Sequence, residues 1–317
     1  MRLAGGVTYG REELPVPTWS EDLALEEFST ELSKFVSVGA DVRTLFYSTQ
    51  DPDVNTFFQM QGDVYLNFRL AKKVNIYLDK GLYSGFEIFG LLNILPANGF
   101  IKAGKFTPDY GMKLDDHTTY IREFTGLSAQ TGSPYFTGAE VGIAPGIFSV
   151  TGGVYNAIDG GNRPPSTSDK AYLGRGDVRF QLSDDIHLGV GANILYKEAA
   201  DGKTKYYGGL GSFSWKNVTL LGEVDLLESD LAGVRKTGVV GYGEADWMVI
   251  QGLDLKFIYD FYDQDKDLAT GSVSRYSAGL EFFPLPGVEV RPLYRIPVED
   301  PTDTKNNEFD LILHFYL

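Results

Sequence analysis

The last ten residues of the chain, Glu308 to Leu317, alternate between two kinds of side chain. The apolar positions are Phe309, Leu311, Leu313, Phe315 and Leu317, and the positions between them are Glu308, Asp310, Ile312, His314 and Tyr316. Because successive side chains of a strand point to opposite faces, this segment is a strand with one apolar face and one mostly polar face. A terminal strand of this kind fits a transmembrane β-barrel, which is apolar outside and polar inside.

The same alternation recurs from Phe35 onward. In one clear example, one face of the strand has Val36, Val38, Ala40 and Val42 and the other face has Ser37, Gly39, Asp41 and Arg43. In a second, one face has Ile186, Leu188, Val190, Ala192 and Ile194 and the other face has His187, Gly189, Gly191 and Asn193. Many charges lie in mid-strand on the second face, which indicates that this face meets water in a lumen. The sequence therefore predicts an all-β fold: a transmembrane, antiparallel, up-and-down β-barrel.

The alternating segments add up to about sixteen strands. We predict them near 35–47, 56–70, 74–83, 86–93, 99–106, 134–143, 147–157, 171–182, 186–197, 205–215, 218–227, 237–249, 253–262, 274–283, 288–297 and 307–317. Short connections with turn residues, such as Pro96-Ala97-Asn98, alternate with mostly longer polar ones, such as Asp159 to Asp169. This alternation is typical of short periplasmic turns and longer extracellular loops, and an even number of strands places both termini in the periplasm.

The composition agrees with a barrel. The mean hydropathy is −0.14, which is compatible with a membrane barrel because only alternate residues meet lipid. The longest uncharged stretch, Val141 to Ile158, contains Pro145 and several glycines and is a poor spanning helix. The net charge of −15 argues against a nucleic acid partner. We identify no secretory signal and expect a mature form from which the signal has been removed.

Residues 1–34 differ from the rest of the chain. Thr18 and Glu21 have the spacing of a capping box, and Leu25, Phe28 and Leu32 recur at helical spacing. This pattern predicts a short amphipathic helix from Ser20 to Ser33 in a periplasmic N-terminal segment. The segment is either a simple lead-in to the barrel of residues 35–317 or an element that plugs it or docks a partner.

The connection from Thr107 to Ser133 is the longest and follows the fifth predicted strand. With about sixteen strands and a long third extracellular loop, residues 35–317 resemble the general bacterial outer-membrane porins. In that family the third loop folds into the barrel and narrows the pore. The terminal alternation also resembles the C-terminal signature of outer-membrane barrels, which usually end in Phe or Trp, whereas this chain ends in Leu317.

A second resemblance covers a short segment. Ile101 to Gly111 (IKAGKFTPDYG) is similar to a strand-to-loop passage of the phosphate-selective porins. That group uses a ladder of Arg and Lys for anions, and this chain has no such excess of basic residues.

The charges expected inside the barrel form two groups. The expected pore constriction consists of Lys105, Asp109, Lys113, Asp115, Asp116, Arg122 and Glu123. The expected lumen wall includes Arg43, Arg69, Arg175, Arg179, Asp63, Glu223, Asp225 and Asp254. Acids outnumber bases on the predicted inner faces, and facing opposite charges create a field across the pore. The sequence therefore predicts passive diffusion of small hydrophilic solutes or ions with a mild preference for cations.

Other functions find less support in the sequence. The three histidines, His117, His187 and His314, lie far apart and predict no metal site. The segment Asp263 to Asp267 resembles the start of a calcium loop but lacks the later Gly and Glu. We therefore predict no enzyme, cofactor or metal. The expected partners are outer-membrane lipid, lipopolysaccharide and solutes, and a homotrimer or a protein bound through residues 1–34 stays open.

One alternative function comes from a different class of protein. The barrel could be a structural subunit of an envelope-spanning complex, such as an electron conduit or an assembly for secretion, motility or adhesion. The acidic N-terminal segment and the modest length of most loops keep this alternative open.

Overall fold

The computed structural model describes residues 14–17, 30–81, 85–114, 116–127, 134–157 and 163–317. They form one sheet of seventeen strands, in which the three-residue β1 precedes sixteen long strands. The strands are β1 (Glu31–Ser33), β2 (Val36–Thr49), β3 (Val54–Ala71), β4 (Val74–Gly81), β5 (Phe86–Leu95), β6 (Gly99–Phe106), β7 (Phe136–Ile143), β8 (Phe148–Asn156), β9 (Lys170–Ser183), β10 (Ile186–Ala199), β11 (Gly202–Trp215), β12 (Val218–Leu231), β13 (Val234–Ile250), β14 (Leu253–Asp263), β15 (Ser272–Leu285), β16 (Val288–Glu299) and β17 (Glu308–Tyr316). The helix α3 (Tyr120–Glu123) lies between β6 and β7.

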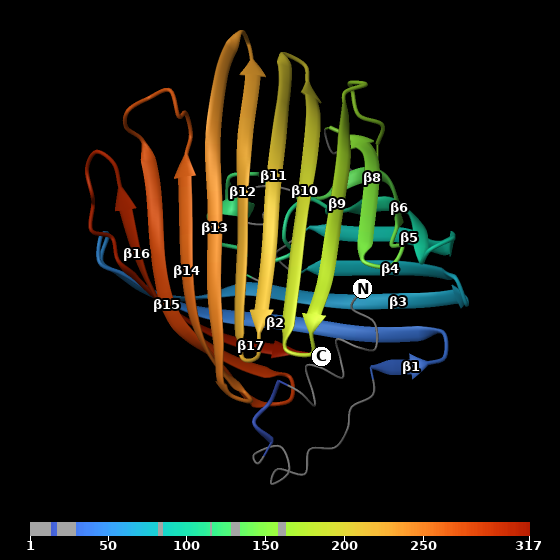
Figure 1. Ribbon diagram of the computed structural model, residues 1–317, viewed down its shortest axis with the longest axis horizontal. Helices are drawn as coiled ribbons and strands as arrows, with labels where there is room; N and C mark the ends of the chain where they lie inside the picture. Colours follow the sequence, from blue (N-terminus) through green and yellow to red (C-terminus); the bar gives the residue numbers. More distant parts are fainter. Residues whose placement is uncertain (1–13, 18–29, 82–84, 115, 128–133, 158–162) are drawn as a thin grey trace.

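The sixteen long strands close into a barrel. Each of them pairs antiparallel with the next, and β17 pairs with β2, so that Leu313 lies opposite Thr44 and Phe315 opposite Val42. Figure 1 shows the wall formed by β9–β13 in front of β2–β4, with the strands of the two walls crossing because all of them are tilted. The predicted closed, antiparallel, up-and-down barrel is confirmed.

The two faces of the barrel differ as the alternation predicted. In β17, Asp310, Ile312 and His314 are buried, whereas Leu313 and Phe315 are exposed. The outward side chains of the other strands are also largely apolar and exposed, which suits contact with lipid. Closure of the barrel pairs both edges of each of the sixteen long strands. Among the described residues, no helix is long and apolar enough to cross a membrane.

Two of the outer connections are shorter than the sequence predicted. The hairpins β10–β11 and β12–β13 continue as paired strands to tight turns after Ala199 and Leu231. Ala232 and Gly233 both have positive φ, the conformation of a type I′ hairpin turn. An Ala at the first position is a weak sequence signal for this turn, so the residues around it looked like a longer loop.

The turns after β3, β5, β7, β9, β11, β13 and β15 are all short and lie at the other end of the barrel, where residues 14–17 lie too. The Val16 N–H donates to the Phe283 carbonyl at 3.0 Å, and the Gln251 side chain donates to the Pro15 carbonyl at 3.1 Å. At the C-terminus, the Tyr316 N–H donates to the carbonyl of Gly287 in a short turn at 2.9 Å. This end of the barrel is called the short-turn end below.

The predicted N-terminal helix falls mostly outside the described residues. Its last three residues, Glu31–Ser33, form strand β1 instead of a helix. They pair with the start of β2, where Glu31 lies opposite Ser37. Pairing with a strand already held in the barrel satisfies backbone groups that the local pattern assigned to a helix.

Candidate functional site in the barrel lumen

The connection between β6 and β7 folds into the lumen and contacts many parts of the wall. We call its described residues, 107–114 and 116–127, the lumen loop. The hydrogen bonds that reach from this loop to the wall include Thr107 to Glu87 of β5, Asp109 to Glu140 of β7, Met112 to Glu223 of β12, His117 to Gln61 of β3 and Tyr120 to Asp260 of β14. These partners come from strands around the barrel, so the loop crosses the lumen. This is the position that the resemblance to the general porins implied for the third outer connection.

Asp116 ties the middle of the loop to β16. Its carboxylate lies 2.8 Å from the Arg295 guanidinium and accepts hydrogen bonds from Thr118. Burial alone would raise the pKa of Asp116, but Arg295 and Arg275 hold it well below its usual range. Arg295 also lies 3.1 Å from Asp310 of β17. The loop therefore supplies one of the two carboxylates that neutralise this buried base.

A second ionic contact lies at the start of α3. Asp260 of β14 is fully buried, accepts the Tyr120 N–H at 3.0 Å and lies 2.7 Å from Arg275 of β15. Arg275 also donates to the Thr118 carbonyl at 2.8 Å. Wall charges thus satisfy backbone groups of the loop that would otherwise be buried without partners.

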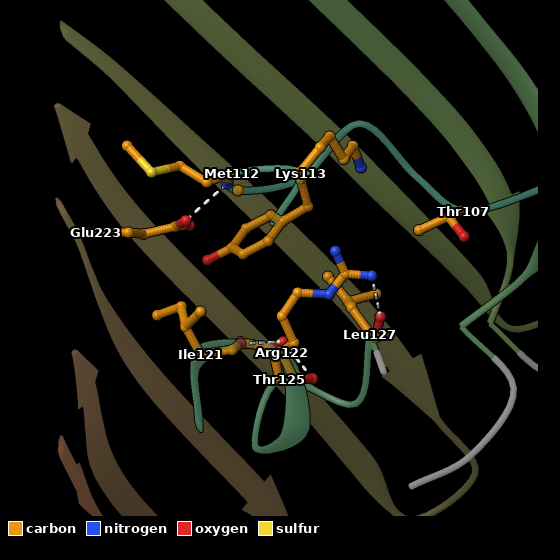
Figure 2. A pocket seen from close by; sticks show the side chains of 10 residues that line it. Thr107, Met112, Lys113, Ile121, Arg122, Thr125, Leu127 and Glu223 are labelled. Atoms are coloured by element: carbon orange, nitrogen blue, oxygen red, sulfur yellow. Dashed lines mark hydrogen bonds between the residues drawn. The ribbon is translucent and has the colours of Figure 1, made fainter. Parts of the chain in front are cut away.

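Arg175 of β9 holds the first part of the loop. Its guanidinium donates to the Gly111 carbonyl at 2.6 Å and lies 3.3 Å from the Asp109 carboxylate. Next to it, the Met112 N–H donates to Glu223 of β12 at 2.6 Å, as drawn in Figure 2. Among the wall residues expected from the sequence, Arg175 and Glu223 are therefore direct partners of the loop.

Apolar side chains of the loop also pack on the inner wall. Tyr110 and Leu127 join one buried cluster, whose wall members are Phe106, Phe136, Tyr155, Ala171, Leu173 and Leu195. Ile121 joins a second one with Val240, Tyr242, Ile258 and Leu293. These two clusters remove apolar surface from water on both sides of the lumen and make the loop a fixed part of the barrel.

Two basic side chains of the loop differ in their surroundings. Arg122 donates to the carbonyls of Leu114 at 2.9 Å and Leu127 at 3.4 Å and so braces the loop internally. Figure 2 shows Arg122 reaching from α3 toward the segment with Met112 and Lys113. Lys113 donates to the Pro108 carbonyl at 2.6 Å and is accessible from the lumen. Although its side chain meets the lumen, the surrounding barrel wall partly desolvates the ammonium and lowers the pKa of Lys113 to about 8.

The other three residues expected in the constriction, Glu123, Asp115 and Lys105, do not share one location. Glu123 is half-buried at the end of α3, and burial raises its pKa. Asp115 lies outside the described residues. Lys105 belongs to β6 and lies in register with Ile88 and Thr137, on the outer face of the barrel. The placement of Lys105 in the constriction is therefore wrong, because the strand alternation extends through this residue to Phe106, which points inward.

The expected lumen-wall residues lie at two heights in the barrel. Arg69 and Arg179, at the short-turn end, are away from the loop, and Arg69 lies 3.8 Å from Glu31. Asp254 is also near this end, next to the turn before β14. Asp63, Glu223 and Asp225 are buried deeper in the lumen, and Arg43 lies 3.3 Å from Asp41. The structure thus brings Glu223 and Arg175 to the loop and separates Arg69, Arg179 and Asp254 from it.

A continuous belt of charged side chains runs along the inner wall from β13 to β2, and the sequence alone did not predict it. Lys256 lies 2.8 Å from Glu244, 2.9 Å from Asp246 and 3.4 Å from Glu281. The next links join Arg291 to Glu281 and Glu289, His314 to Glu289 and Asp41, and Arg43 to Asp41. The strand alternation places each of these residues inward, but only the strand register shows that they touch.

Two cavities adjoin the loop. The pocket in Figure 2, between the two halves of the loop and Glu223, has a volume of about 20 Å³, which is room for about one water molecule. A cavity of about 130 Å³ separates Lys113 and Asp116 of the loop from Lys256 and Arg291 of the belt. The loop is thus tightly packed on the side of Glu223 and leaves polar space on the side of the belt. In the described residues, no group of three or more His, Cys, Asp or Glu could hold a metal ion.

A closed barrel of sixteen strands with an apolar outer face and a charged lumen crossed by a loop is the architecture of the bacterial outer-membrane β-barrel porins. The comparisons with known proteins agree on the fold. OprB of Pseudomonas putida aligns with 90% of this chain and 94% of its own length at 9% identity, with a TM-score of 0.70. OmpT of Vibrio cholerae aligns with 91% and 100% at 12% identity, with a TM-score of 0.66.

A third similar structure is the outer membrane protein OpdK of Pseudomonas aeruginosa. It aligns with 92% of this chain and 100% of its own length at 13% identity, with a TM-score of 0.55. No protein-family model and no curated protein sequence matches the chain. The chain therefore has the porin fold, and its low identity to these structures leaves solutes and partners to be argued from its own residues.

Proposed function

We infer that the protein is an outer-membrane porin that allows passive diffusion of small hydrophilic solutes and ions, with a mild preference for cations. The water-filled lumen is the pathway, and the lumen loop is its constriction. The short-turn end faces the periplasm in this proposal, as short turns do in bacterial barrels. Lys113, Asp109, Asp116, Arg122 and Glu123 are the constriction residues on the loop.

The charged belt is the observation that carries the cation preference. Its bases Arg43, Lys256 and Arg291 each lie between or beside carboxylates, and the carboxylates are Asp41, Glu244, Asp246, Glu281 and Glu289. Acids therefore outnumber permanently charged bases along this wall. A ring with an excess of one sign raises the local concentration of counter-ions, which here are cations.

Planar-bilayer recording in a gradient of KCl tests this proposal. We expect stable channels whose reversal potential indicates a preference for K⁺ over Cl⁻. The double variant Glu281→Gln/Glu289→Gln, which removes two belt carboxylates and keeps their size, should shift the reversal potential toward Cl⁻. A matched substitution of exposed loop acids, Asp267→Asn/Asp303→Asn, should leave it unchanged. An anion-selective wild-type channel, or no channel, contradicts the proposal.

The alternative proposal, a structural barrel in an envelope-spanning complex, gains support from the contacts of the N-terminal segment. Pro15 is fully buried against the barrel, and Glu31 lies 3.8 Å from Arg69 of β3. Two parts of the N-terminal segment are therefore attached to the short-turn end. Deleting residues 1–33 tests this function. Loss of a stoichiometric partner that co-purifies with the full chain would favour the complex, whereas unchanged assembly and conductance would favour the simple porin.

A further inference from the structure

The cavity of about 130 Å³ between the lumen loop and the charged belt has charged side chains on two sides and an apolar floor. Lys113, Leu114 and Asp116 line it from the loop. Its wall residues are Leu221, Tyr242, Glu244, Lys256, Ile258, Glu281, Arg291 and Leu293. An engineered protein cavity of about 150 Å³ binds benzene, so a cavity of this size suits a solute not much larger than a benzene ring.

The loop side of the cavity presents a positive charge. The Lys113 ammonium donates to the Pro108 carbonyl at 2.6 Å, and in the described part of the chain it forms no ion pair. An ammonium carries more N–H groups than this one contact uses, so Lys113 has donors left for a solute. Asp116, the other charged residue on this side, lies 2.8 Å from Arg295 and is neutralised by it. Lys113 therefore sets the sign of the charge on the loop side.

The belt side presents a negative charge. Its two permanently charged bases, Lys256 and Arg291, lie against four carboxylates, which are Glu244, Asp246, Glu281 and Glu289. Glu244 lies 2.8 Å from Lys256 and accepts the Tyr242 hydroxyl, and as a carboxylate it has lone pairs for a further N–H. The electric field across the cavity therefore points from the loop to the belt.

Apolar side chains from three strands form the floor of the cavity. Leu221 of β12, Ile258 of β14 and Leu293 of β16 line it together. Leu293 lies opposite Gly279 of β15, where an added Cβ would come within 2.9 Å of the Leu293 side chain. Leu221 is only partly buried, so its apolar surface is accessible to a solute in the cavity. An apolar group that packs on this floor leaves water, which favours binding.

We propose that this cavity binds zwitterionic α-amino acids with a small apolar side chain as they pass the constriction. The carboxylate binds Lys113, the ammonium binds Glu244, and the side chain packs on Leu221. These three features lie on different sides of one cavity, so a single solute needs all three groups to use them. This inference rests on the proposed porin function and names a solute class for it.

Solutes that lack one of the three groups fit the cavity less well. A carboxylate without an amine meets the excess of acid on the belt, and an amine without a carboxylate meets Lys113. Glycine has both charges but no side chain for the floor. Each contact is weak enough for the solute to leave again, as passage through a pore requires.

Titration by saturation-transfer NMR, with the full chain in detergent micelles, tests the cavity. L-valine is compared with isovalerate, which lacks its ammonium, with isobutylamine, which lacks its carboxylate, and with glycine. We expect the dissociation constant of valine to be about tenfold lower than that of each analogue. A factor of this size corresponds to one charged hydrogen bond or one packed apolar side chain.

Two substitutions assign the contacts. Lys113→Met should weaken the binding of valine about tenfold and strengthen that of isobutylamine, because it removes both an attraction and a repulsion, whereas general damage to the loop would weaken both. Leu221→Ser should weaken valine and leave glycine within about twofold of the wild type. Lys203→Met, at an exposed lysine of β11, is the control and should change neither.

The outcomes separate this inference from the porin function. Valine that binds no more tightly than isovalerate and isobutylamine overturns the proposed site, and so does valine binding that Lys113→Met leaves unchanged. Planar-bilayer recording decides the porin function independently. Cation-selective channels without valine binding leave only the porin function standing. Valine binding with the expected effects of both substitutions, but without channels, leaves only the binding site standing.

Discussion

Charged side chains inside the barrel form ion pairs with side chains of opposite charge. Arg295 lies between Asp116 and Asp310, and Lys256 lies among three carboxylates. Removing one member of a buried pair leaves the other without compensation, and this costs more than the pair itself contributes. Substitutions of Asp116 or Arg295 are therefore expected to change the position of the loop as well as the local charge.

Lys113 should make ion preference depend on pH. Its pKa is lowered to about 8, so it is mostly charged at pH 7 and mostly neutral at pH 9. Raising the pH through this range removes a positive charge from the constriction, and the preference for K⁺ over Cl⁻ should increase by up to about twofold. Reversal potentials at the two pH values measure this change. Lys113→Met should have the higher preference at both values, and an equally large shift in this variant would contradict the assignment.

Asp116 should control the attachment of the loop to the wall. Asp116→Asn removes the carboxylate 2.8 Å from Arg295, so we expect a destabilisation of about 3–5 kcal/mol and a noisier, larger single-channel current. The temperature at which the folded barrel unfolds in SDS gel electrophoresis measures the first effect. Asp303→Asn, at an exposed position, is the control. Unchanged current and unfolding temperature would show that the pair contributes nothing to loop position.

The same pair determines how the loop responds to acid. The pKa of Asp116 is lower in the folded protein than in the unfolded chain, so its stabilising contribution is present above the unfolded value of about 4. It is lost only as the pH falls below that value toward the folded pKa. The noise of the wild-type single-channel current, which increases when the Asp116–Arg295 contact is lost, should therefore stay constant from pH 7 to pH 4 and increase in stronger acid.

At the scale of secondary structure, the lumen loop determines how much of the barrel is open. A sixteen-stranded barrel without internal segments leaves an aqueous channel. Here the loop reaches β3, β5, β7, β9, β12, β14 and β16 and packs into two apolar clusters on the wall. The strands provide the frame, and this one connection sets the size and charge of the path.

Shortening the loop should increase conductance. Replacing residues 112–127 with a short Gly-Ser linker removes Lys113, Asp116 and α3 from the lumen, and we expect single-channel conductance to rise about twofold or more. The same linker in place of residues 264–271, in the connection between β14 and β15, is the control. Equal conductance of the wild type and the shortened loop would mean that the constriction lies elsewhere in the barrel.

At the scale of the whole molecule, the barrel separates a lipid-facing surface from an aqueous interior. The sequence contains no cysteine, so single cysteines can report on each surface without a background. In β10, His187 has the parity of the lumen face, and Leu188 lies in register with Phe180 and Phe213 on the outer face. The two neighbouring positions therefore test the orientation of the whole strand.

A membrane-impermeant thiol reagent should label His187→Cys and not Leu188→Cys. Thiolates form readily in water and poorly in lipid, so the rates should differ by about tenfold or more. Labelling is measured in native membranes without detergent. As the control, both variants are labelled after denaturation, where the two cysteines should react equally. Faster labelling of Leu188→Cys would mean that the faces of the barrel are inverted.

The sequence alone determined the features that depend on a local period. Alternation of side chains gave the sixteen long strands, with most boundaries within a few residues, and it correctly predicted that Asp41 and Asp260 point inward while Val42 and Phe315 point outward. These inferences held because the period of a strand is a property of neighbouring residues. The position of the third outer connection inside the barrel was implied by the resemblance to the general porins and not by a local period.

Only the tertiary structure decided which residues meet. It assigned Lys105 to the outer face, paired Asp116 with Arg295, and joined Lys256, Arg291 and His314 into one belt. It also placed the ring of Tyr77 between those of Tyr65 and Phe89. These contacts depend on strand register and on the path of the loop, which arise from pairings between residues distant in sequence. A local pattern contains no information about those distances, so the face of a residue could be predicted but its partner could not.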